Sequence, residues 1–350
     1  MMLPVNAVAI DCRFAHLPVG LGRYTREIVH HLAQREDGLR YVLIVLPAGE
    51  QWAGSQQRCT VLTASAQPYA LREQWELPRL VRRAKAGLLF VPHFNAPLSC
   101  PVPFCLTIHD LILHRYPNRA SFPRRIAYRF LFSRAVRGAQ RIVAVSRFTA
   151  AELRALYGEE VSVKVSVVHE GVAPAFHPKS EEEQEAVLRR YGIRKPFFLY
   201  VGNAKEHKNV PLLLDAFSRL SPTPSSLVLI LVGSEAKRIR VREGVKVLPG
   251  VPEEHLPALY SAATAFVTAS RYEGFGLPVA EAAACGSPII TTAAGALPEV
   301  APEGTMFLPS TVDAFTKAME NPPAPLPPRA FSWERAAEET AGVLRRCLGT

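Results

Sequence analysis

The chain has 350 residues, which at roughly 150 residues per domain suggests about two domains. Hydrophobic residues make up 48% and charged residues 21%, a balance typical of globular proteins that excludes wholesale disorder. Lys and Arg outnumber Asp and Glu by 41 to 31, and the resulting formal charge of +10 favours anionic partners without choosing among nucleotides, nucleic acids and acidic lipids.

Short apolar runs alternate with amphipathic stretches through the first half of the chain. The runs that we expect to be strands are residues 5–11, 41–46, 88–91, 104–108, 141–145 and 163–168. The stretches that we expect to be helices are residues 22–34, 73–86, 122–136 and 148–157. Nearly continuous apolar strands that alternate with helices predict a parallel sheet covered on both faces.

The same pattern starts again in the second half. The expected strands are residues 197–201, 227–232, 245–248, 265–268, 288–291 and 306–308, and the expected helices are residues 211–220, 252–262, 277–285 and 312–319. A polar gap at residues 174–195 interrupts the series, so we predict an α/β fold with two doubly wound domains rather than one barrel. Inside the gap, Ser180 and Glu183 form a capping box that predicts a further helix up to Tyr191.

A glycine-rich turn after the expected strand at 265–268 is the strongest candidate site. Gly274 and Gly276 permit an unusual turn, and Pro278 suits the first turn of a helix. Free amides at a helix N-terminus bind phosphate, whereas the flanking Glu273 and Glu281 can accept hydrogen bonds from sugar hydroxyls. The pattern fits a sugar nucleotide, and the alternative is an ordinary loop with solvated glutamates.

The loop at residues 200–209 follows the first strand of the second half. Gly202 stands at the strand exit, and Lys205 and Lys208 could neutralise a diphosphate as point charges. The alternative is a solvated basic loop.

Two features of the first half follow expected strands. Gly20 and Gly22 form half of a dinucleotide fingerprint, but Thr25 stands where the third glycine should be, which disfavours an NAD-dependent enzyme. His109 and Asp110 end the strand at 104–108, where ligands of open α/β sheets bind. The alternative is a structural histidine.

An arginine-rich stretch with interleaved aromatic residues occupies the expected helix at 122–136 and its C-terminal neighbourhood. Its basic residues are Arg124, Arg125, Arg129, Arg134, Arg137 and Arg141. A basic amphipathic helix suits an anionic membrane surface or a lipid-diphosphate acceptor. The alternative is a solvated helix with its aromatic residues in the core, and no nucleic-acid-binding module is recognisable.

Cysteine spacing, the N-terminal residues and the longest uncharged run indicate the cellular compartment that we expect for the protein. The six cysteines form no CxxC pair or zinc spacing, so reduced thiols are expected. Residues 1–10 carry no basic segment, and prolines break the longest uncharged run, residues 86–109. We expect a cytoplasmic protein, with peripheral attachment to the inner face of a membrane as a further option.

Taken together and in this order, these motifs resemble family 4 retaining glycosyltransferases of GT-B architecture, and among them a mannosyltransferase-like branch. Residues 273–281 match the Glu-x7-Glu signature of that family, and residues 270–278 and 285–288 follow its pattern. Residues 200–203, 10–24 and 331–334 match its phosphate loop, its first strand and loop, and its terminal helix.

The resemblance implies a two-domain enzyme with a nucleotide-sugar donor in an interdomain cleft. The implied domains are an acceptor-side domain at 1–173, a donor-binding domain at 174–330, and a crossover helix at 331–350 that packs on the first domain. The implied catalytic residues are Glu273, His109 and Lys208. The implied donor-binding residues are Gly20, Gly22, Gly202, Asn203, Lys208, Val251, Glu273, Gly274, Phe275, Gly276, Leu277 and Glu281.

Within this set the resemblance assigns separate roles. Glu273 would bind the hydroxyls of the donor sugar, His109 would lie near the transferred sugar, and Glu281 would hold the ribose. The diphosphate would contact Lys208 and the amides of residues 275–277, with Gly20 and Gly22 approaching from the other domain. The backbone near Val251 would meet the base.

One departure from the family pattern concerns the cations. Many members carry an arginine where this chain has Asn203, so Lys205 or Arg271 would share the role of Lys208. No DxD sequence occurs, and we therefore expect metal-independent transfer without a further cofactor.

The resemblance leaves the donor and the acceptor open. GDP-mannose is the first choice of donor, a UDP-sugar is the alternative, and the acceptor would be a glycan or a lipid-linked glycan. A non-catalytic sugar-nucleotide-binding partner of another transferase is the alternative from a different class, and retained Glu273, Lys208 and Glu281 speak against it.

Overall fold

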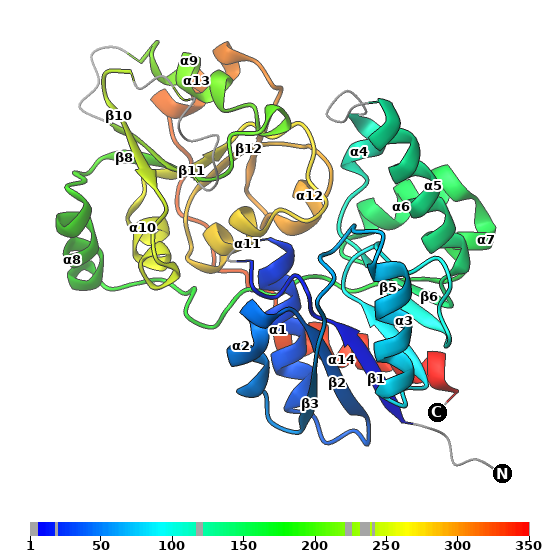
Figure 1. Ribbon diagram of the computed structural model, residues 1–350. Helices are drawn as coiled ribbons and strands as arrows, with labels where there is room; N and C mark the ends of the chain where they lie inside the picture. Colours follow the sequence, from blue (N-terminus) through cyan, green and yellow to red (C-terminus); the bar gives the residue numbers. More distant parts are fainter. Residues whose placement is uncertain are drawn as a thin grey trace. The chain divides into compact units, whose positions relative to one another are not determined.

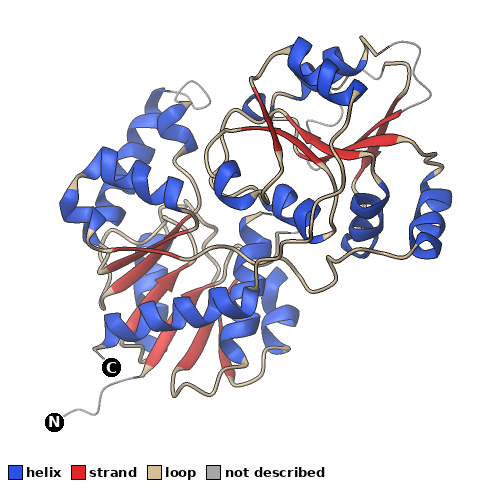
Figure 2. Cartoon of the chain, turned by 180° about the vertical axis from the view of Figure 1, so that it is seen from behind, coloured by secondary structure: helices blue, strands red, loops and turns tan. Residues whose placement is uncertain are grey.

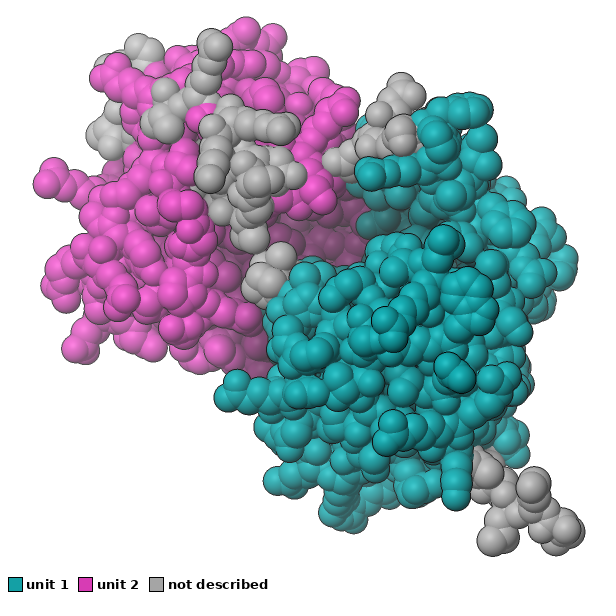
Figure 3. Space-filling view, viewed as in Figure 1, with its two compact units in different colours: residues 1–170, 333–350 teal, residues 171–332 magenta. Residues whose placement is uncertain are grey.

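The computed structural model describes residues 6–17, 20–116, 122–220, 226–231, 239 and 242–349. The chain forms two compact units, residues 1–170 together with 333–350, and residues 171–332 (Figure 3). We call them unit 1 and unit 2. The sequence-based domain boundaries, 173/174 and 330/331, lie within three residues of these divisions. Val172 N–H donates to the Phe331 carbonyl at 2.8 Å, so the segments that lead into and out of unit 2 run side by side.

Unit 1 is built on a parallel sheet of seven described strands in the order β3-β2-β1-β4-β5-β6-β7 (Figure 1). These strands are β1 (Ala7–Asp11), β2 (Arg40–Val45), β3 (Cys59–Thr63), β4 (Leu88–Val91), β5 (Phe104–Ile108), β6 (Arg141–Ala144) and β7 (Val165–Val167). The helices are α1 (Leu21–Ala33), α2 (Glu50–Gly54), α3 (Glu73–Arg83), α4 (Ile112–Arg115), α5 (Phe122–Gly138), α6 (Arg147–Tyr157), α7 (Glu159–Ser162) and α14 (Trp333–Leu348), with a 3-10 turn η1 (Pro47–Gly49).

Helices cover both faces of this sheet, as the nearly continuous apolar strands predict. Apolar side chains of α3, α5 and α6, among them Leu80, Phe132 and Leu153, pack on one face. Helix α14 lies across the other face beside α1 (Figure 2), where the rings of Trp333 and Tyr24 meet at 5.7 Å. The apolar side chains of α14 that face the sheet and α1 are buried, among them Trp333, Ala337 and Leu344.

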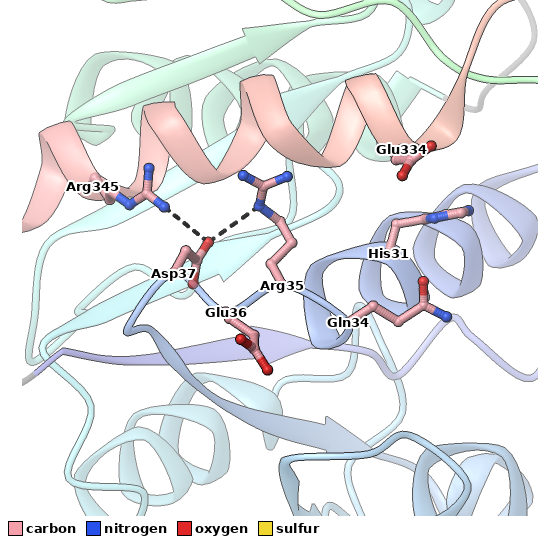
Figure 4. A pocket seen from close by; sticks show the side chains of 7 residues that line it. All are labelled: His31, Gln34, Arg35, Glu36, Asp37, Glu334 and Arg345. Atoms are coloured by element: carbon pink, nitrogen blue, oxygen red, sulfur yellow. Dashed lines mark hydrogen bonds and ion pairs between the residues drawn. The ribbon is translucent and has the colours of Figure 1, made fainter.

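A polar pocket of about 400 Å³ lies where α14 passes the end of α1 (Figure 4). Asp37, in the loop after α1, has a buried side chain that pairs with Arg345 of α14 at 3.2 Å and with Arg35 at 3.4 Å. His31 and Glu334 line the same pocket. Since a carboxylate shared by two guanidinium groups fixes both segments, this pocket anchors the C-terminal helix to unit 1.

Unit 2 contains a second parallel sheet, in the order β10-β9-β8-β11-β12-β13. Its strands are β8 (Phe197–Gly202), β9 (Ser226–Leu231), β10 (Val245–Pro249), β11 (Ala265–Thr268), β12 (Ile289–Thr292) and β13 (Met306–Leu308). The helices are α8 (Glu181–Tyr191), α9 (Val210–Phe217), α10 (Leu256–Ala262), α11 (Leu277–Ala284), α12 (Leu297–Val300) and α13 (Val312–Glu320), with 3-10 turns η3 (Glu206–Lys208) and η5 (Glu253–His255). Helix α8 has the predicted capping box at Ser180 and Glu183.

The prediction of an α/β fold with two Rossmann-like sheets is confirmed. Every described strand pairing is parallel, and strands alternate with helices in unit 2 as they do in unit 1. The sequence analysis was wrong about the edge of unit 1, where it missed β3. This edge strand is only half-buried, so Cys59–Thr63 lacks the continuous apolar run of the central strands. Among the described residues, no helix is both long and apolar enough to cross a membrane.

Candidate functional site

The loop between β11 and α11 holds Glu273 in a polar network. Its Oε1 atom accepts hydrogen bonds from Lys208 Nζ at 2.6 Å and from Ser270 Oγ at 2.7 Å. Thr268, at the end of β11, contacts Ser270 through its hydroxyl at 3.1 Å. Within the described ranges of the chain, Oε2 of Glu273 makes no hydrogen bond, so the carboxylate is fixed through one oxygen and can accept a ligand hydroxyl with the other.

The backbone of Glu273 is fixed by a glycine that the sequence analysis did not single out. The carbonyl of Glu273 accepts from Ala296 N–H at 3.0 Å. Gly295, with φ 63°, lies so close that a Cβ atom there would be 2.2 Å from the same carbonyl oxygen. Gly295 follows β12, the neighbour of β11, and only its position after a buried strand could have marked it.

Helix α11 starts directly after this turn. Gly276 precedes it with φ 100°, and a Cβ there would meet Leu297 at 2.7 Å, so the turn needs glycine. No side chain of the described residues caps the helix, and Pro278 lies in its first turn. Pro278 has no N–H and the Val279 N–H donates to the Gly276 carbonyl at 2.9 Å, so the N-terminus offers the Leu277 N–H and a positive helix-dipole end next to Glu273.

The loop after β8 brings Lys208 to the same place. Lys208 ends the short turn η3, and the preceding carbonyl of His207 accepts from Arg271 N–H at 2.7 Å, which ties this loop to the one after β11. Gly202 passes Tyr200 so closely that a Cβ would meet its hydroxyl at 2.9 Å. That hydroxyl donates to the Asn203 carbonyl at 2.6 Å and shapes the start of the loop.

The other expected donor-binding residues of unit 2 have different surroundings. Glu281 is buried, and its Oε2 atom accepts from the Tyr260 hydroxyl at 2.8 Å. Val251 is half-buried in the loop after β10. Lys205 and Arg271 are exposed, and the structure pairs Glu273 with Lys208 instead.

In unit 1, His109 follows β5 and is held between two acceptors. Nδ1 lies 2.9 Å from Glu170 Oε1, and Nε2 lies 3.0 Å from the Pro92 carbonyl oxygen. Burial lowers the pKa of His109, but the Glu170 carboxylate and the Pro92 carbonyl outweigh it, so this pKa is raised. With an acceptor at each nitrogen, the ring fits an imidazolium that donates twice.

The two glycines at the start of α1 differ in their surroundings. Gly20 has φ 58°, and a Cβ there would meet open space. At Gly22, a Cβ atom would come within 2.2 Å of the Leu17 carbonyl oxygen. The close packing of α1 on the preceding loop is therefore by itself a reason for glycine at this position. No group of three or more metal-ligating side chains is found in the described part of the chain.

Two family models match the chain, one for each unit. "Glycosyltransferase Family 4" matches residues 18–176, and "Glycosyl transferases group 1" matches residues 183–322. The chain belongs to glycosyltransferase family 4.

Relatives with known names fit this family. O-antigen chain mannosyltransferase B from Escherichia coli is 31% identical over 60% of this chain and 58% of its own length. O-antigen chain mannosyltransferase RfbU from Salmonella typhimurium is 26% identical over 69% of this chain and 66% of its own length. The chain thus spans about three fifths of the length of these relatives.

The fold is shared with the Anabaena protein HepE, whose structure was solved in complex with UDP-glucose. The two chains have a TM-score of 0.69 at 17% identity, and the match covers 98% of this family 4 chain and 95% of HepE. The Rossmann-like units are those of the GT-B glycosyltransferases.

Proposed function

We propose that this family 4 protein transfers a hexose with retention from a nucleotide sugar to a glycan or lipid-linked glycan, and that mannose from GDP-mannose is the favoured donor group. The observation that carries this proposal is the pairing of Glu273 with Lys208 beside the N-terminus of α11. The names of the two O-antigen mannosyltransferases support mannose, and the UDP-glucose complex of HepE keeps a UDP-sugar as the alternative donor.

In the proposed mechanism, the leaving nucleoside diphosphate gains negative charge as the bond to the sugar breaks. The Lys208 ammonium has three hydrogens, so it can stay on Glu273 and still donate to a phosphate oxygen. The amides of Gly276 and Leu277 at the start of α11 would supply further donors to the diphosphate. Such fixed donors could replace a metal ion, and metal-independent transfer is therefore part of the proposal.

The sugar and the nucleoside would use the remaining groups of the site. Glu273 would accept from a hydroxyl of the transferred hexose through Oε2, which orients the sugar above the leaving group. Glu281, held by Tyr260, would receive the ribose, and the backbone near Val251 the base. His109, as an imidazolium whose two N–H groups are held by Glu170 and Pro92, would act as a fixed positive charge rather than as a base.

A panel of nucleotide sugars tests the proposal. The purified chain is mixed with GDP-mannose, UDP-glucose, UDP-galactose, UDP-N-acetylglucosamine or ADP-glucose, and thermal unfolding and donor hydrolysis are measured with and without EDTA. We expect GDP-mannose to stabilise the protein most, by about 2.7 kcal/mol at a hundredfold excess over Kd, and to be hydrolysed equally in EDTA.

The other outcomes of this panel separate the alternatives. If only a UDP-sugar stabilises the protein, that UDP-sugar and not GDP-mannose is the donor. Binding without turnover would identify a non-catalytic partner. Loss of hydrolysis in EDTA, restored by Mn²⁺, would refute metal independence, and no stabilisation by any donor would refute the function.

We further propose that α5 contacts an anionic membrane surface. The helix has five arginines and no acidic residue, and its Phe122, Ile126 and Phe130 side chains, spaced by four residues, are 65%, 53% and 57% exposed. Tyr128 and Phe132 pack into the core instead, so the aromatic residues divide between two faces. A cavity of about 580 Å³ beside the exposed row is lined by Leu98, among others. The expectation of an amphipathic helix is wrong, because apolar residues occur all around α5. The proposal rests instead on the exposed apolar row and on the arginines, which suit anionic headgroups.

Vesicle binding tests this surface. We expect the chain to sediment with vesicles that contain phosphatidylglycerol and not with pure phosphatidylcholine, and replacement of Phe122, Ile126 and Phe130 by serine to weaken binding at least tenfold. The matched control replaces three exposed apolar residues elsewhere on unit 1, Leu71, Leu156 and Val163, by serine and should bind normally. Equal binding of both triple variants would contradict the proposal.

A further inference from the structure

A cluster of rings lies at the carboxyl ends of β1 and β4, outside the network of Glu273. The Tyr69 hydroxyl and Nε2 of His93 are 2.5 Å apart. Phe14, which follows β1, meets the rings of His93 and Tyr69 at 5.4 and 5.9 Å. Because β1 and β4 are neighbours in the sheet, the cluster lies at the edge where α/β sheets bind their ligands.

Tyr69 adopts a conformation that costs free energy. Its φ angle is 66°, a left-handed value that bulky side chains rarely adopt. The backbone N–H of Tyr69 donates to Glu73 Oε2 at 3.0 Å, which holds the residue in this conformation. Strained residues that the surroundings hold in place are concentrated at binding and catalytic sites.

A buried charge network fixes the base of the cluster. Arg13 forms two 2.8 Å bonds with Asp11 and a 3.0 Å ion pair with Glu73. Asn95, two residues after His93, donates to both oxygens of Glu73 at 3.1 Å. The segments that carry Phe14, Tyr69 and His93 are thereby joined to one rigid support, and the rings are preorganised.

The exposed side of the cluster combines polar and apolar groups. The Tyr69 side chain is about half exposed, and Phe14 and His93 are half-buried. Burial and the nearby His109 lower the pKa of His93 to about 3, so its ring is neutral and can accept as well as donate. Ring faces that pack on C–H groups, next to a paired hydroxyl and imidazole, suit a neutral sugar with vicinal hydroxyls.

We propose that Phe14, Tyr69 and His93 form the subsite for the acceptor sugar, in which the Tyr69–His93 pair exchanges hydrogen bonds with an acceptor hydroxyl. This inference rests on the proposed glycosyltransferase function and adds the residues that recognise its second substrate. Tyr69 and His93 are positioning and specificity residues of this subsite, and we expect donor binding to be independent of both.

The test separates acceptor binding from donor binding. Saturation-transfer NMR is recorded for methyl α-D-mannopyranoside, methyl α-D-glucopyranoside and N-acetylglucosamine with wild type, Tyr69→Phe and His93→Ala, and the thermal shift by GDP-mannose and UDP-glucose is measured on the same proteins. We expect at least one sugar to bind the wild type, and each variant to bind it about tenfold more weakly with an unchanged donor shift.

Trp75→Ala is the matched control, because Trp75 is an exposed aromatic residue close in sequence that lies outside the ring cluster. It should bind sugar and donor like the wild type. Equal sugar binding in Tyr69→Phe and Trp75→Ala, or no sugar binding to a wild type that binds donor, would overturn the subsite alone. A wild type that binds no donor would overturn the proposed function and the subsite with it.

Discussion

Replacement of Glu273 by glutamine is expected to lower the rate of glycosyl transfer by about a hundredfold or more, with the donor that the panel identifies. The amide has one carbonyl oxygen, whereas the carboxylate receives Lys208 and Ser270 on one oxygen and can receive a sugar hydroxyl on the other. Lys208→Ala should have a similar effect, since it removes the cation that would face the leaving group. Steady-state kinetics with the purified variants measure both losses.

Two further variants show whether these losses are specific to the site. Glu254→Gln neutralises an exposed glutamate of unit 2 and should leave the rate unchanged. Each single variant leaves a partly buried charge without its partner, so part of its effect is on stability. The double variant Lys208→Met with Glu273→Gln removes both charges, and we expect it to regain stability but no activity. Full activity of both single variants would contradict the assignment.

The sequence predicted the central strands and the residues at their ends but not how those residues pair. Glu273 and Lys208 are 65 positions apart, and each could be assigned to a loop because a buried apolar strand precedes it. The bond between them depends on the adjacency of β8 and β11, which the hydrophobic pattern does not specify. The same holds for His109 and Glu170, which lie in different loops of unit 1.

The hydrophobic pattern also could not predict which residues of α5 face the core. Apolar residues occur all around this helix, so periodicity cannot tell that Phe132 faces the core whereas Phe130 faces outward. Packing against β5 and its neighbours decides this. The edge strand β3 was missed for a related reason, because a strand that is covered on one side only is less apolar than the strands inside the sheet.

Gly295→Ala is expected to destabilise unit 2 by about 3 kcal/mol and to lower the transfer rate at least a hundredfold. Part of the cost is the left-handed conformation at φ 63°, worth about 1 kcal/mol for alanine. The rest comes from the new methyl group, which would lie 2.2 Å from the Glu273 carbonyl oxygen and must displace that backbone. Urea unfolding and transfer kinetics measure the two effects.

Gly192→Ala separates the collision from the conformational cost. Gly192 ends α8 with φ 57°, almost the same angle, and its new methyl group would meet only the flexible ammonium end of Lys246. This control should lose about 1 kcal/mol and keep its activity. The two variants differ chiefly in whether the new methyl group displaces the backbone of Glu273. A large difference between their transfer rates would therefore show that the position of the Glu273 carboxylate limits transfer. Equal rates would mean that Glu273 can move without consequence, which the proposed mechanism does not allow.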